Sequence, residues 1–400
     1  MDPLTNSPHV LIFPFPVQGH VSCMLKLAEL LCLSGVTVTF LNSDIIHRRL
    51  IRYTDVISRF SRYSGFRFET ISDGLPPDHP RSGNRVVDIF DSIKMVTKPM
   101  FREMLIPGGC LNCGSRPPVS SVIADGIMCF TIDVAKEMGI PVFLFRTVSA
   151  SCFWAFYCIP KLIQSGDLPI KEDDDMDRLV NGVTGMEKYL RLRDLPSFCR
   201  ASDLSDRGFQ VVTSETQETH RANGLILNTF EDLEESALAQ IRKHVPNLYA
   251  IGPLHAHLNS RLKARMTSPL RSSNSLWEED RTCMTWLDEQ AQKVVVETII
   301  KDLMDVKRDE LRRPVDRMMK LARKSVAEDG NSYRNLNRLI TDIKTFGKIS
   351  NGSRAFVNGF RIVALLSSSF TLHIHIAVNI NQFLPFCFSR FRFNQLISQS

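Results

Sequence analysis

The stretch HVLIFPFPVQGHVSCMLKLAELLCLSGVTVTFL, residues 9–41, decides the fold of this chain. Residues 9–15 are dominated by apolar side chains, which is typical of a strand buried on both faces of a parallel sheet. Apolar residues then recur at helical spacing over 24–31, and Gly35 is placed to end that helix. Residues 36–41 are rich in β-branched side chains and predict a second strand. Strand, helix and strand in this order form a βαβ unit, whose crossover is right-handed.

The same alternation of strands and helices continues along the chain. Strands are predicted at 119–124, 142–145, 224–228 and 247–251, and helices at 130–138 and 231–244. Repeated alternation of this kind predicts an α/β fold built on a doubly wound parallel sheet. We therefore expect residues 1–254 to form one Rossmann-like domain.

The basic balance of the chain belongs to its C-terminal segment. The net charge is +6, but residues 346–400 contain five basic residues and no acidic residue. The rest of the chain, with 44 basic and 43 acidic residues, is close to neutral. A body without excess charge does not attract a polyanion, so no nucleic-acid partner is expected.

The ten cysteines are scattered and predict neither a metal site nor a disulfide framework. The only pair with CxxC spacing is Cys110 and Cys113, which lies in a stretch rich in Gly and Pro and has no second pair. The first eight residues lack the basic start and the apolar core of a secretion signal. A cytoplasmic location is therefore the expectation.

The turn after the first strand contains a candidate catalytic residue, His20. No GxGxxG follows the strand, so a standard dinucleotide site is not predicted there. An imidazole at the carboxyl edge of a parallel sheet can accept a proton from a hydroxyl group near neutral pH. The alternative is a histidine at a helix terminus that only bonds to the backbone.

Asp125 follows the apolar run of the strand predicted at 119–124. The carboxyl ends of parallel strands meet at one edge of the sheet, so Asp125 and His20 are expected on the same side. A carboxylate there can bond to one imidazole nitrogen and stabilise the imidazolium that forms when the ring takes a proton. The alternative is that Asp125 only caps the following helix.

Several stretches together resemble plant secondary-product UDP-glycosyltransferases, and within that family the enzymes that glucosylate iridoids. The resemblance covers roughly residues 8–344, and the combination of motifs is specific. The stretches are HVLIFPFPVQGHV at 9–21, ISDGLP at 71–76, ADGIMCFTIDVAKEMGIP at 124–141, LRLRDLPSF at 190–198, NGLILNTFEDLE at 223–234, NLYAIGPL at 247–254 and WLDEQ at 286–290.

The resemblance implies a two-domain GT-B fold and an inverting transfer of glucose from UDP-glucose, with no further cofactor and no metal. The acceptor would be a hydroxyl or carboxyl group of a small lipophilic plant metabolite, such as an iridoid, another terpenoid or a flavonoid. His20 would be the base and Asp125 its partner. The loops after the N-terminal strands, including the segment 190–198, would surround the acceptor. The implied acceptor-binding residues are Gln18, Gly19, Phe145 and Ser149.

The donor-binding box of the resembled family is missing from the sequence. That box begins with a tryptophan and has a second one in its core, whereas no tryptophan follows Trp286 in this chain. Residues 255–293 are expected to form a linker. Residues 294–344, which resemble the family's final helices, are expected to form a truncated helical remnant of the second domain. We therefore expect the affinity for UDP-sugars to be weak or absent.

The segment 345–400 is atypical because it is hydrophobic and basic. Residues 346–400 contain nine of the 25 phenylalanines, and 362–378 carry no formal charge. A non-native extension is the favoured interpretation, and membrane association through this segment is the alternative. Three functions stay open at this stage: a glucosyltransferase, a non-catalytic acceptor-binding or interaction protein, and a membrane-associated protein. The oligomeric state is not encoded in any motif.

Overall fold

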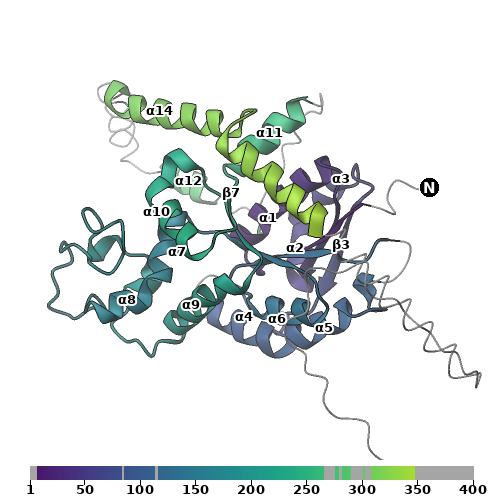
Figure 1. The fold of residues 1–400 in the computed structure, drawn as a ribbon, viewed down its shortest axis with the longest axis horizontal. Coiled ribbons are helices and arrows are strands. Elements are labelled where there is room, and N and C mark those ends of the chain that lie inside the picture. Colours follow the sequence, from purple (N-terminus) through teal and green to yellow (C-terminus); the bar gives the residue numbers. More distant parts are fainter. Residues whose placement is uncertain are drawn as a thin grey trace, which may run out of the picture. The chain divides into compact units, whose positions relative to one another are not determined.

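The fold is built around one parallel sheet (Figure 1). The computed structural model of the chain describes residues 7–82, 85–112, 116–264, 275–278, 282–289, 301 and 308–346. The chain divides into the units 1–352 and 353–400, and the second unit lies outside the described residues. The seven strands have the order β3-β2-β1-β4-β5-β6-β7. Their bounds are β1 His9–Phe13, β2 Thr37–Ser43, β3 Phe66–Ile71, β4 Ser121–Asp125, β5 Val142–Arg146, β6 Gly224–Leu227 and β7 Leu248–Ala250.

The strand order confirms the predicted doubly wound α/β class. The chain moves outward from β1 to β3 on one side and from β4 to β7 on the other. β1 and β4 are therefore neighbours, paired in parallel from Val10 with Ser121 to Phe13 with Ala124. The two strands lie at the point where the order reverses, which is where doubly wound sheets bind ligands, outside the carboxyl ends of the strands.

Alternate residues of each strand pack into two separate cores, one on each face of the sheet. Leu11 and Phe13 belong to the first core, and Val10 and Ile12 to the second. The first core is covered by α4 Val86–Ser92, α5 Lys98–Leu105, α6 Phe130–Glu137, α7 Ala150–Tyr157, α8 Ile159–Gln164, α9 Arg207–Gln217 and α10 Glu231–His244. The second core is covered by α1 Gln18–Leu33, α2 Asp44–Tyr53, α3 Val56–Phe60, α11 Leu254–Ala264 and the helical residues 331–346.

Short helical turns connect several of these elements. The π-helical segment Ile93–Thr97 joins α4 to α5, and single 3-10 turns occur at Cys110–Asn112, Leu192–Asp194, Ser197–Cys199 and Glu218–Arg221.

Helix α1 illustrates how the sequence builds these layers. Its apolar stripe, from Val21 to Leu31, is buried against the sheet. Gly35 follows the helix with a φ of 75°, a left-handed conformation that glycine adopts without strain. Glu29 lies fully buried in the helix, and its carboxylate accepts hydrogen bonds from Arg59 and from the hydroxyl of Tyr63. A buried charge needs such partners, because it is costly to remove from water alone.

The beginning of the expected linker is a packed helix. Residues 254–264 form α11, and Leu254, Leu258 and Leu262 are buried in the second core. These leucines recur at a spacing of four, which is the spacing of one helix face. The polar residues between them hid this signal, so the prediction of a linker from residue 255 is wrong for this part. Farther along, the structure describes α12 Thr282–Glu289.

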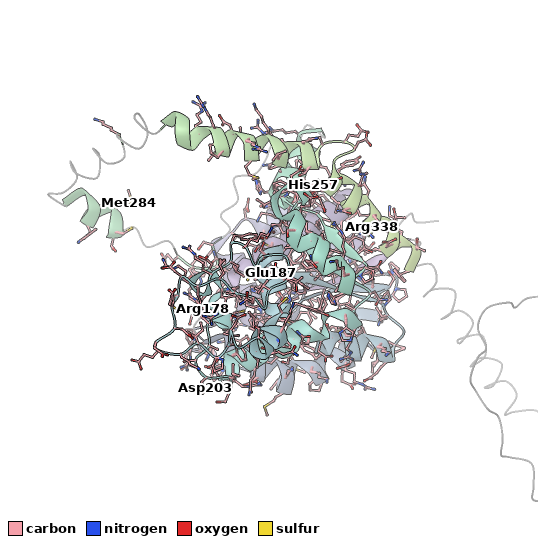
Figure 2. The ribbon with its side chains drawn as sticks, turned by 60° about the vertical axis from the view of Figure 1, so that its left-hand side comes forward. Arg178, Glu187, Asp203, His257, Met284 and Arg338 are labelled. Atoms are coloured by element: carbon pink, nitrogen blue, oxygen red, sulfur yellow. The ribbon has the colours of Figure 1, made fainter. Side chains whose placement is uncertain are left out.

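The C-terminal helices begin with α14 Arg308–Val326, and residues 331–346 form a further helix. This further helix packs on the second core through Leu336, Leu339 and Ile343, which are fully buried. The hydroxyl of Tyr249 in β7 donates to Asp342 Oδ2 at 2.6 Å, and Arg338, labelled in Figure 2, donates to the carbonyl of Leu248. Part of the segment 294–344 therefore packs on the second core of the sheet.

The expectations of an atypical C-terminal segment and of membrane association concern residues that are only partly described. The atypical segment lies outside the described residues from 347 onward. Within the described part of the chain, no helix combines the length and the apolar character that a membrane crossing requires.

Candidate functional site

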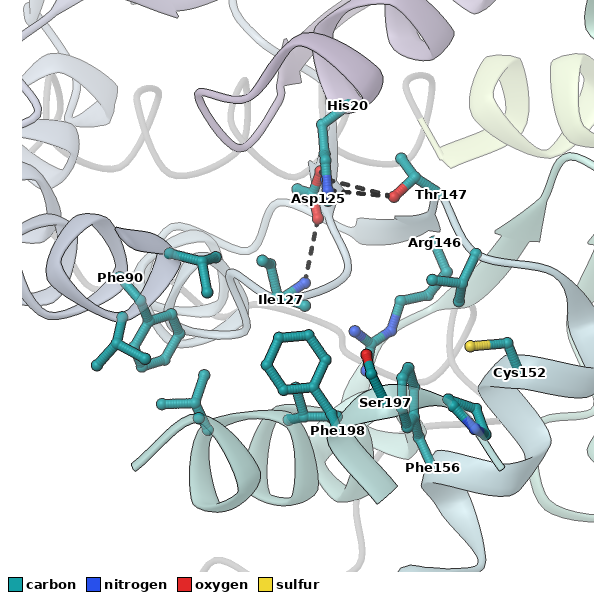
Figure 3. Close-up of a pocket in the computed structure, with 17 residues that line it drawn as sticks. His20, Phe90, Asp125, Ile127, Arg146, Thr147, Cys152, Phe156, Ser197 and Phe198 are labelled. Carbon is teal, nitrogen blue, oxygen red and sulfur yellow. Dashed lines mark hydrogen bonds and ion pairs between the residues drawn. The ribbon is translucent and has the colours of Figure 1, made fainter. Parts of the chain in front are cut away.

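A cavity of about 300 Å³ opens at the carboxyl edge of the sheet, on the side of the first core (Figure 3). Two strand ends contribute to its wall, Asp125 from β4 and Arg146 from β5. His20 and Thr147 complete its polar part. The rest of the lining is largely apolar and includes Val86, Phe90, Phe156, Phe198, Val211 and Val212. A small, mostly apolar cavity with a few convergent polar groups is typical of a small-molecule site.

His20 and Asp125 meet in this cavity, as the sequence predicts. His20 Nδ1 lies 2.6 Å from Asp125 Oδ2, although the two residues are 105 positions apart in the chain. His20 lies in the first turn of α1, directly after the loop that leaves β1. The side chain of His20 is 24% exposed and that of Asp125 is 1% exposed. The imidazole can therefore contact both the cavity and a fully enclosed carboxylate.

The backbone holds the carboxylate of Asp125 in place. Its Oδ2 accepts a hydrogen bond from the N–H of Phe15, and its Oδ1 accepts one from the N–H of Ile127, both at 3.3 Å. The alternative that Asp125 caps the following helix is wrong. That helix, α6, begins at Phe130, and its N-cap residue is Cys129.

The Asp125 contact fixes the proton arrangement of His20. A carboxylate can only accept, so Nδ1 of the imidazole carries the proton and donates it to Asp125. In the neutral ring, Nε2 is then left with a lone pair. The hydroxyl oxygen of Thr147 lies 3.4 Å from both ring nitrogens, which is long for a hydrogen bond. The imidazole is thus able to take a proton at Nε2.

Opposing effects set the pKa of His20. Burial disfavours the imidazolium, but the negative charge and the hydrogen bond of Asp125 outweigh that effect, so the pKa is raised above its ordinary value. The positive charge of Arg146 opposes the rise. A base with a raised pKa holds an abstracted proton more firmly, and Asp125 supplies that hold.

Arg146 also contributes a polar group to the cavity, although no sequence motif points to it. It is the last residue of β5 and is only 3% exposed. Its Nη2 donates to the hydroxyl of Thr216, and its guanidinium lies 5.4 Å from the centroid of the Phe153 ring. Burial lowers the pKa of Arg146 from its ordinary value. The available signal was its position, since it alternates with Val142 and Leu144, which face the first core.

The implied acceptor-binding residues lie outside the lining of the cavity. Phe145 is fully buried in the second core, because strand alternation turns it away from the face that Arg146 occupies. Its assignment to the acceptor site is therefore corrected. Ser149 caps α7 by accepting from the N–H of Cys152. Gln18 accepts from the N–H of Leu276, and Gly19 is also absent from the lining.

The segment 190–198 was also expected near the acceptor. Its last three residues, Pro196, Ser197 and Phe198, line the cavity.

Neither a thiol nucleophile nor a metal is supported by the described residues. Cys152 lines the cavity, but burial raises its pKa to about 11, which keeps the thiol protonated near neutral pH. No group of three or more His, Cys, Asp or Glu side chains is arranged to hold a metal ion within the part of the chain that the structure describes. The titratable pair that faces the cavity is that of His20 and Asp125.

Curated proteins similar to this chain are plant enzymes. Over 305 residues the chain is 53% identical to a 7-deoxyloganetic acid glucosyltransferase of Catharanthus roseus, covering 76% of this chain and 63% of the relative. It is 37% identical over 291 residues to UDP-glycosyltransferase 85A5 of Arabidopsis thaliana, covering 73% and 60%. The 7-deoxyloganetin glucosyltransferase of Gardenia jasminoides is 34% identical over 300 residues, covering 73% and 61%. The chain thus spans less than two thirds of the length of these relatives.

Solved structures similar to this chain are also plant glycosyltransferases. Medicago truncatula UGT71G1 complexed with UDP-glucose has a TM-score of 0.49 at 19% identity, covering 72% of this chain and 59% of that one. Os79 from O. sativa in complex with UDP has a TM-score of 0.48 at 21% identity, covering 70% and 58%. No family model matches the chain.

Proposed function

This chain belongs to the plant UDP-glycosyltransferases by homology, and from that premise we propose that its cavity is the acceptor site of a glucosyl transfer. Residues 1–254 are the acceptor-binding domain in this proposal. The observation that supports it is the 2.6 Å contact between His20 and Asp125 in the wall of a largely apolar cavity. An imidazole backed by a carboxylate is the arrangement that activates a hydroxyl group.

The proposed reaction is an inverting displacement. The acceptor hydroxyl gives its proton to Nε2 of His20 while its oxygen forms a bond to the anomeric carbon of UDP-glucose. The bond between that carbon and the phosphate oxygen breaks, and UDP leaves with the electron pair. Asp125 holds the ring in place and balances the positive charge of the imidazolium. Proton transfer by a positioned base contributes about 10²–10⁴-fold to the rate, and the rest comes from positioning.

The acceptor in this proposal is a small lipophilic plant metabolite that presents a hydroxyl or carboxyl group, with an iridoid, another terpenoid or a flavonoid as the class. The size of the cavity and its lining by Phe90, Phe156 and Phe198 support a compact apolar body. Similar proteins are named for an iridoid acid and for a flavonol glycoside, which supports the same class.

Transfer of radiolabelled glucose from UDP-glucose to 7-deoxyloganetic acid tests the proposal. Any transfer by the purified chain yields the labelled glucoside, and His20→Ala is expected to reduce its formation by about 10²–10⁴-fold while the acceptor still binds. Transfer by the variant at the wild-type rate would remove His20 from the mechanism.

A second candidate is acceptor binding without transfer. It is favoured by the largely apolar lining of the cavity, which suits the body of an acceptor rather than the hydrated diphosphate of a donor. Calorimetric titration with UDP-glucose separates the candidates. Micromolar affinity supports transfer by this chain, whereas acceptor binding without donor binding supports the second candidate.

The partner is proposed to be the small-molecule acceptor, and the compartment the cytoplasm. A fluorescent fusion of the full chain tests the compartment. Pelleting with membranes after carbonate washing, lost on deletion of 346–400, would assign the chain to a membrane instead.

A further inference from the structure

Among the described residues, the buried cation of Arg146 has no ion-pair partner. A guanidinium has five N–H donors and keeps its charge in proteins. Within the described residues, the guanidinium of Arg146 forms one hydrogen bond, from Nη2 to the hydroxyl of Thr216. Its buried Nε atom has no hydrogen-bond partner there. Burying an unpaired charge is costly, so a partner of opposite charge is expected.

The nearby carboxylates are engaged elsewhere. Asp125 is bonded to His20 at 2.6 Å. Glu215 lies 2.8 Å from Lys94 Nζ and accepts from the N–H of Cys129 at 2.8 Å. Among the described residues, no carboxylate oxygen lies within 4.0 Å of a guanidinium nitrogen of Arg146. Asp125 and Glu215 still attract the Arg146 guanidinium electrostatically, but within the described residues it forms no ion pair, so a group from outside the chain can pair with it.

The surrounding backbone shapes a place for this side chain. A Cβ on Gly126, the residue after β4, would lie 2.3 Å from Arg146 Cδ and 2.9 Å from Nε. The aliphatic part of the Arg146 side chain therefore passes directly over Gly126. A residue with a Cβ at position 126 would not leave room for it. Figure 3 shows the guanidinium extending from the end of β5 into the space that Phe156 and Phe198 also border.

We propose that Arg146 binds a carboxylate of the acceptor, so that the cavity selects small lipophilic hydroxy acids. The carboxylate pairs with the guanidinium at one end, while the hydroxyl to be glucosylated lies at His20. Phe90, Phe156 and Phe198 enclose the apolar body between them. The placement of the hydroxyl rests on the function proposed above, whereas the preference for an anion rests on Arg146 alone.

The apolar lining favours this occupant over a phosphate of the donor. A nucleotide diphosphate is hydrated and highly charged. The described lining of the cavity offers it one unpaired cation, Arg146. A hydroxy acid with a hydrocarbon body instead buries apolar surface against the valines and phenylalanines of the wall.

Calorimetric titration with 7-deoxyloganetic acid and with its methyl ester tests the proposal. The wild type is expected to bind the acid about tenfold more tightly or better, the ratio that a charge-assisted hydrogen bond supplies. Arg146→Met, close in length and without charge, is expected to bind the two ligands equally. Arg102→Met, a change at an exposed arginine paired with Glu137, is the matched control and keeps the preference.

Four outcomes would overturn the proposal. The first three are equal binding of acid and ester by the wild type, failure of the wild type to bind the acid at millimolar concentration, and an unchanged preference in Arg146→Met. A fourth is displacement of the acid by UDP that depends on Arg146, since this would assign the site to the donor. The wild-type arms decide the matter even if Arg146→Met does not fold, which circular dichroism checks.

Failure of the proposed function is distinguishable from failure of this inference. His20→Ala retains Arg146, so it keeps the preference for the acid even though transfer is lost. A chain that prefers the acid but transfers no glucose contradicts the transfer reaction and leaves the role of Arg146 standing. A chain that transfers glucose equally well to acid and ester, with equal affinities, contradicts the role of Arg146 alone.

Discussion

The two polar ends of the cavity differ in how their charge is balanced. At one end, His20 faces a carboxylate that is enclosed and bonded by backbone N–H groups. At the other end, Arg146 contacts the hydroxyl of Thr216 and the ring of Phe153, and it forms no ion pair with a carboxylate in the part of the chain that the structure describes. Both ends lie at the carboxyl edge of the same sheet.

The difference separates two tasks. A base becomes positively charged when it takes up a proton. A permanent carboxylate partner stabilises that charge without help from a ligand. A buried group that is always charged and has no ion pair has an uncompensated desolvation cost. An anionic ligand compensates for that cost, so the group favours anionic ligands. The His20 end is built for proton transfer and the Arg146 end for selective binding.

The largest effect is expected from His20→Ala at the paired end. Loss of the base should reduce transfer by about 10²–10⁴-fold, as removal of general base catalysis does. Acceptor affinity should change by no more than a few-fold, because the apolar wall and Arg146 remain. Kinetics with radiolabelled UDP-glucose and calorimetry with the acceptor measure the two quantities.

His220→Ala is the matched control for that variant, since this histidine is exposed and bonds only to the carbonyl of Gln217 among the described residues. It should leave both quantities unchanged. A loss of acceptor binding in His20→Ala as large as the loss of transfer would mean that the paired end serves binding as well.

Asp125→Asn should lower the pKa of His20, because it removes the charge and the hydrogen bond that outweigh burial. NMR titration of the imidazole measures this. The buried His9 and His257 have pKa values lowered to about 4, so they do not titrate in the same range. Asp133→Asn, at a surface ion pair with Arg221, is the control. An unchanged His20 titration in Asp125→Asn would contradict the pairing.

The same pair predicts a pH dependence of stability. The folded pKa of His20 is raised, so the folded state binds a proton more tightly than the unfolded state. The stabilisation is fully present below about pH 6.5, the ordinary histidine value, and is lost as the pH rises through the folded pKa. The difference in unfolding free energy between wild type and Asp125→Asn should therefore shrink with rising pH. A difference that grows with pH would contradict the direction of the shift.

The paired end could be predicted from the sequence, whereas the unpaired end could not. His20 and Asp125 each follow an apolar run, and parallel strands bring such positions to one edge of a sheet. Their partnership therefore needed only the strand assignments. Arg146 is the last residue of β5, one position beyond the strand that the apolar residues predict at 142–145.

Strand parity explains the error at Phe145. Phe145 is apolar, as the lining of a site for a lipophilic acceptor should be. Alternate residues of a strand face opposite sides of the sheet, however, and it is Arg146 that faces the side with the cavity. Parity could be known only once the faces of the sheet were assigned to helices. The contributions of Phe90, Phe198 and Val211 come from helices and turns far apart in the chain, which no local pattern brings together.

Gly126→Ala should weaken the unpaired end without deleting its charge. The added methyl group would collide with the stem of Arg146, so the guanidinium must move. The preference for the acid over its ester should fall several-fold, while the pKa of His20 changes little. Gly65→Ala is the control, since a Cβ there meets only ordinary contacts. An unchanged preference for the acid would show that the position of the guanidinium is not critical.

Thr147→Val should have the smallest effect and tests how exclusive the pairing of His20 is. Thr147 is the nearest polar neighbour of the imidazole besides Asp125, but its hydroxyl is 3.4 Å from both ring nitrogens and cannot bond well to either. Valine keeps the shape of the side chain and removes the hydroxyl. The His20 titration and the acid preference should therefore both stay close to those of the wild type. A fall in the pKa of His20 as large as that in Asp125→Asn would instead make Thr147 a second partner of the base, and the paired end would be a network of three side chains.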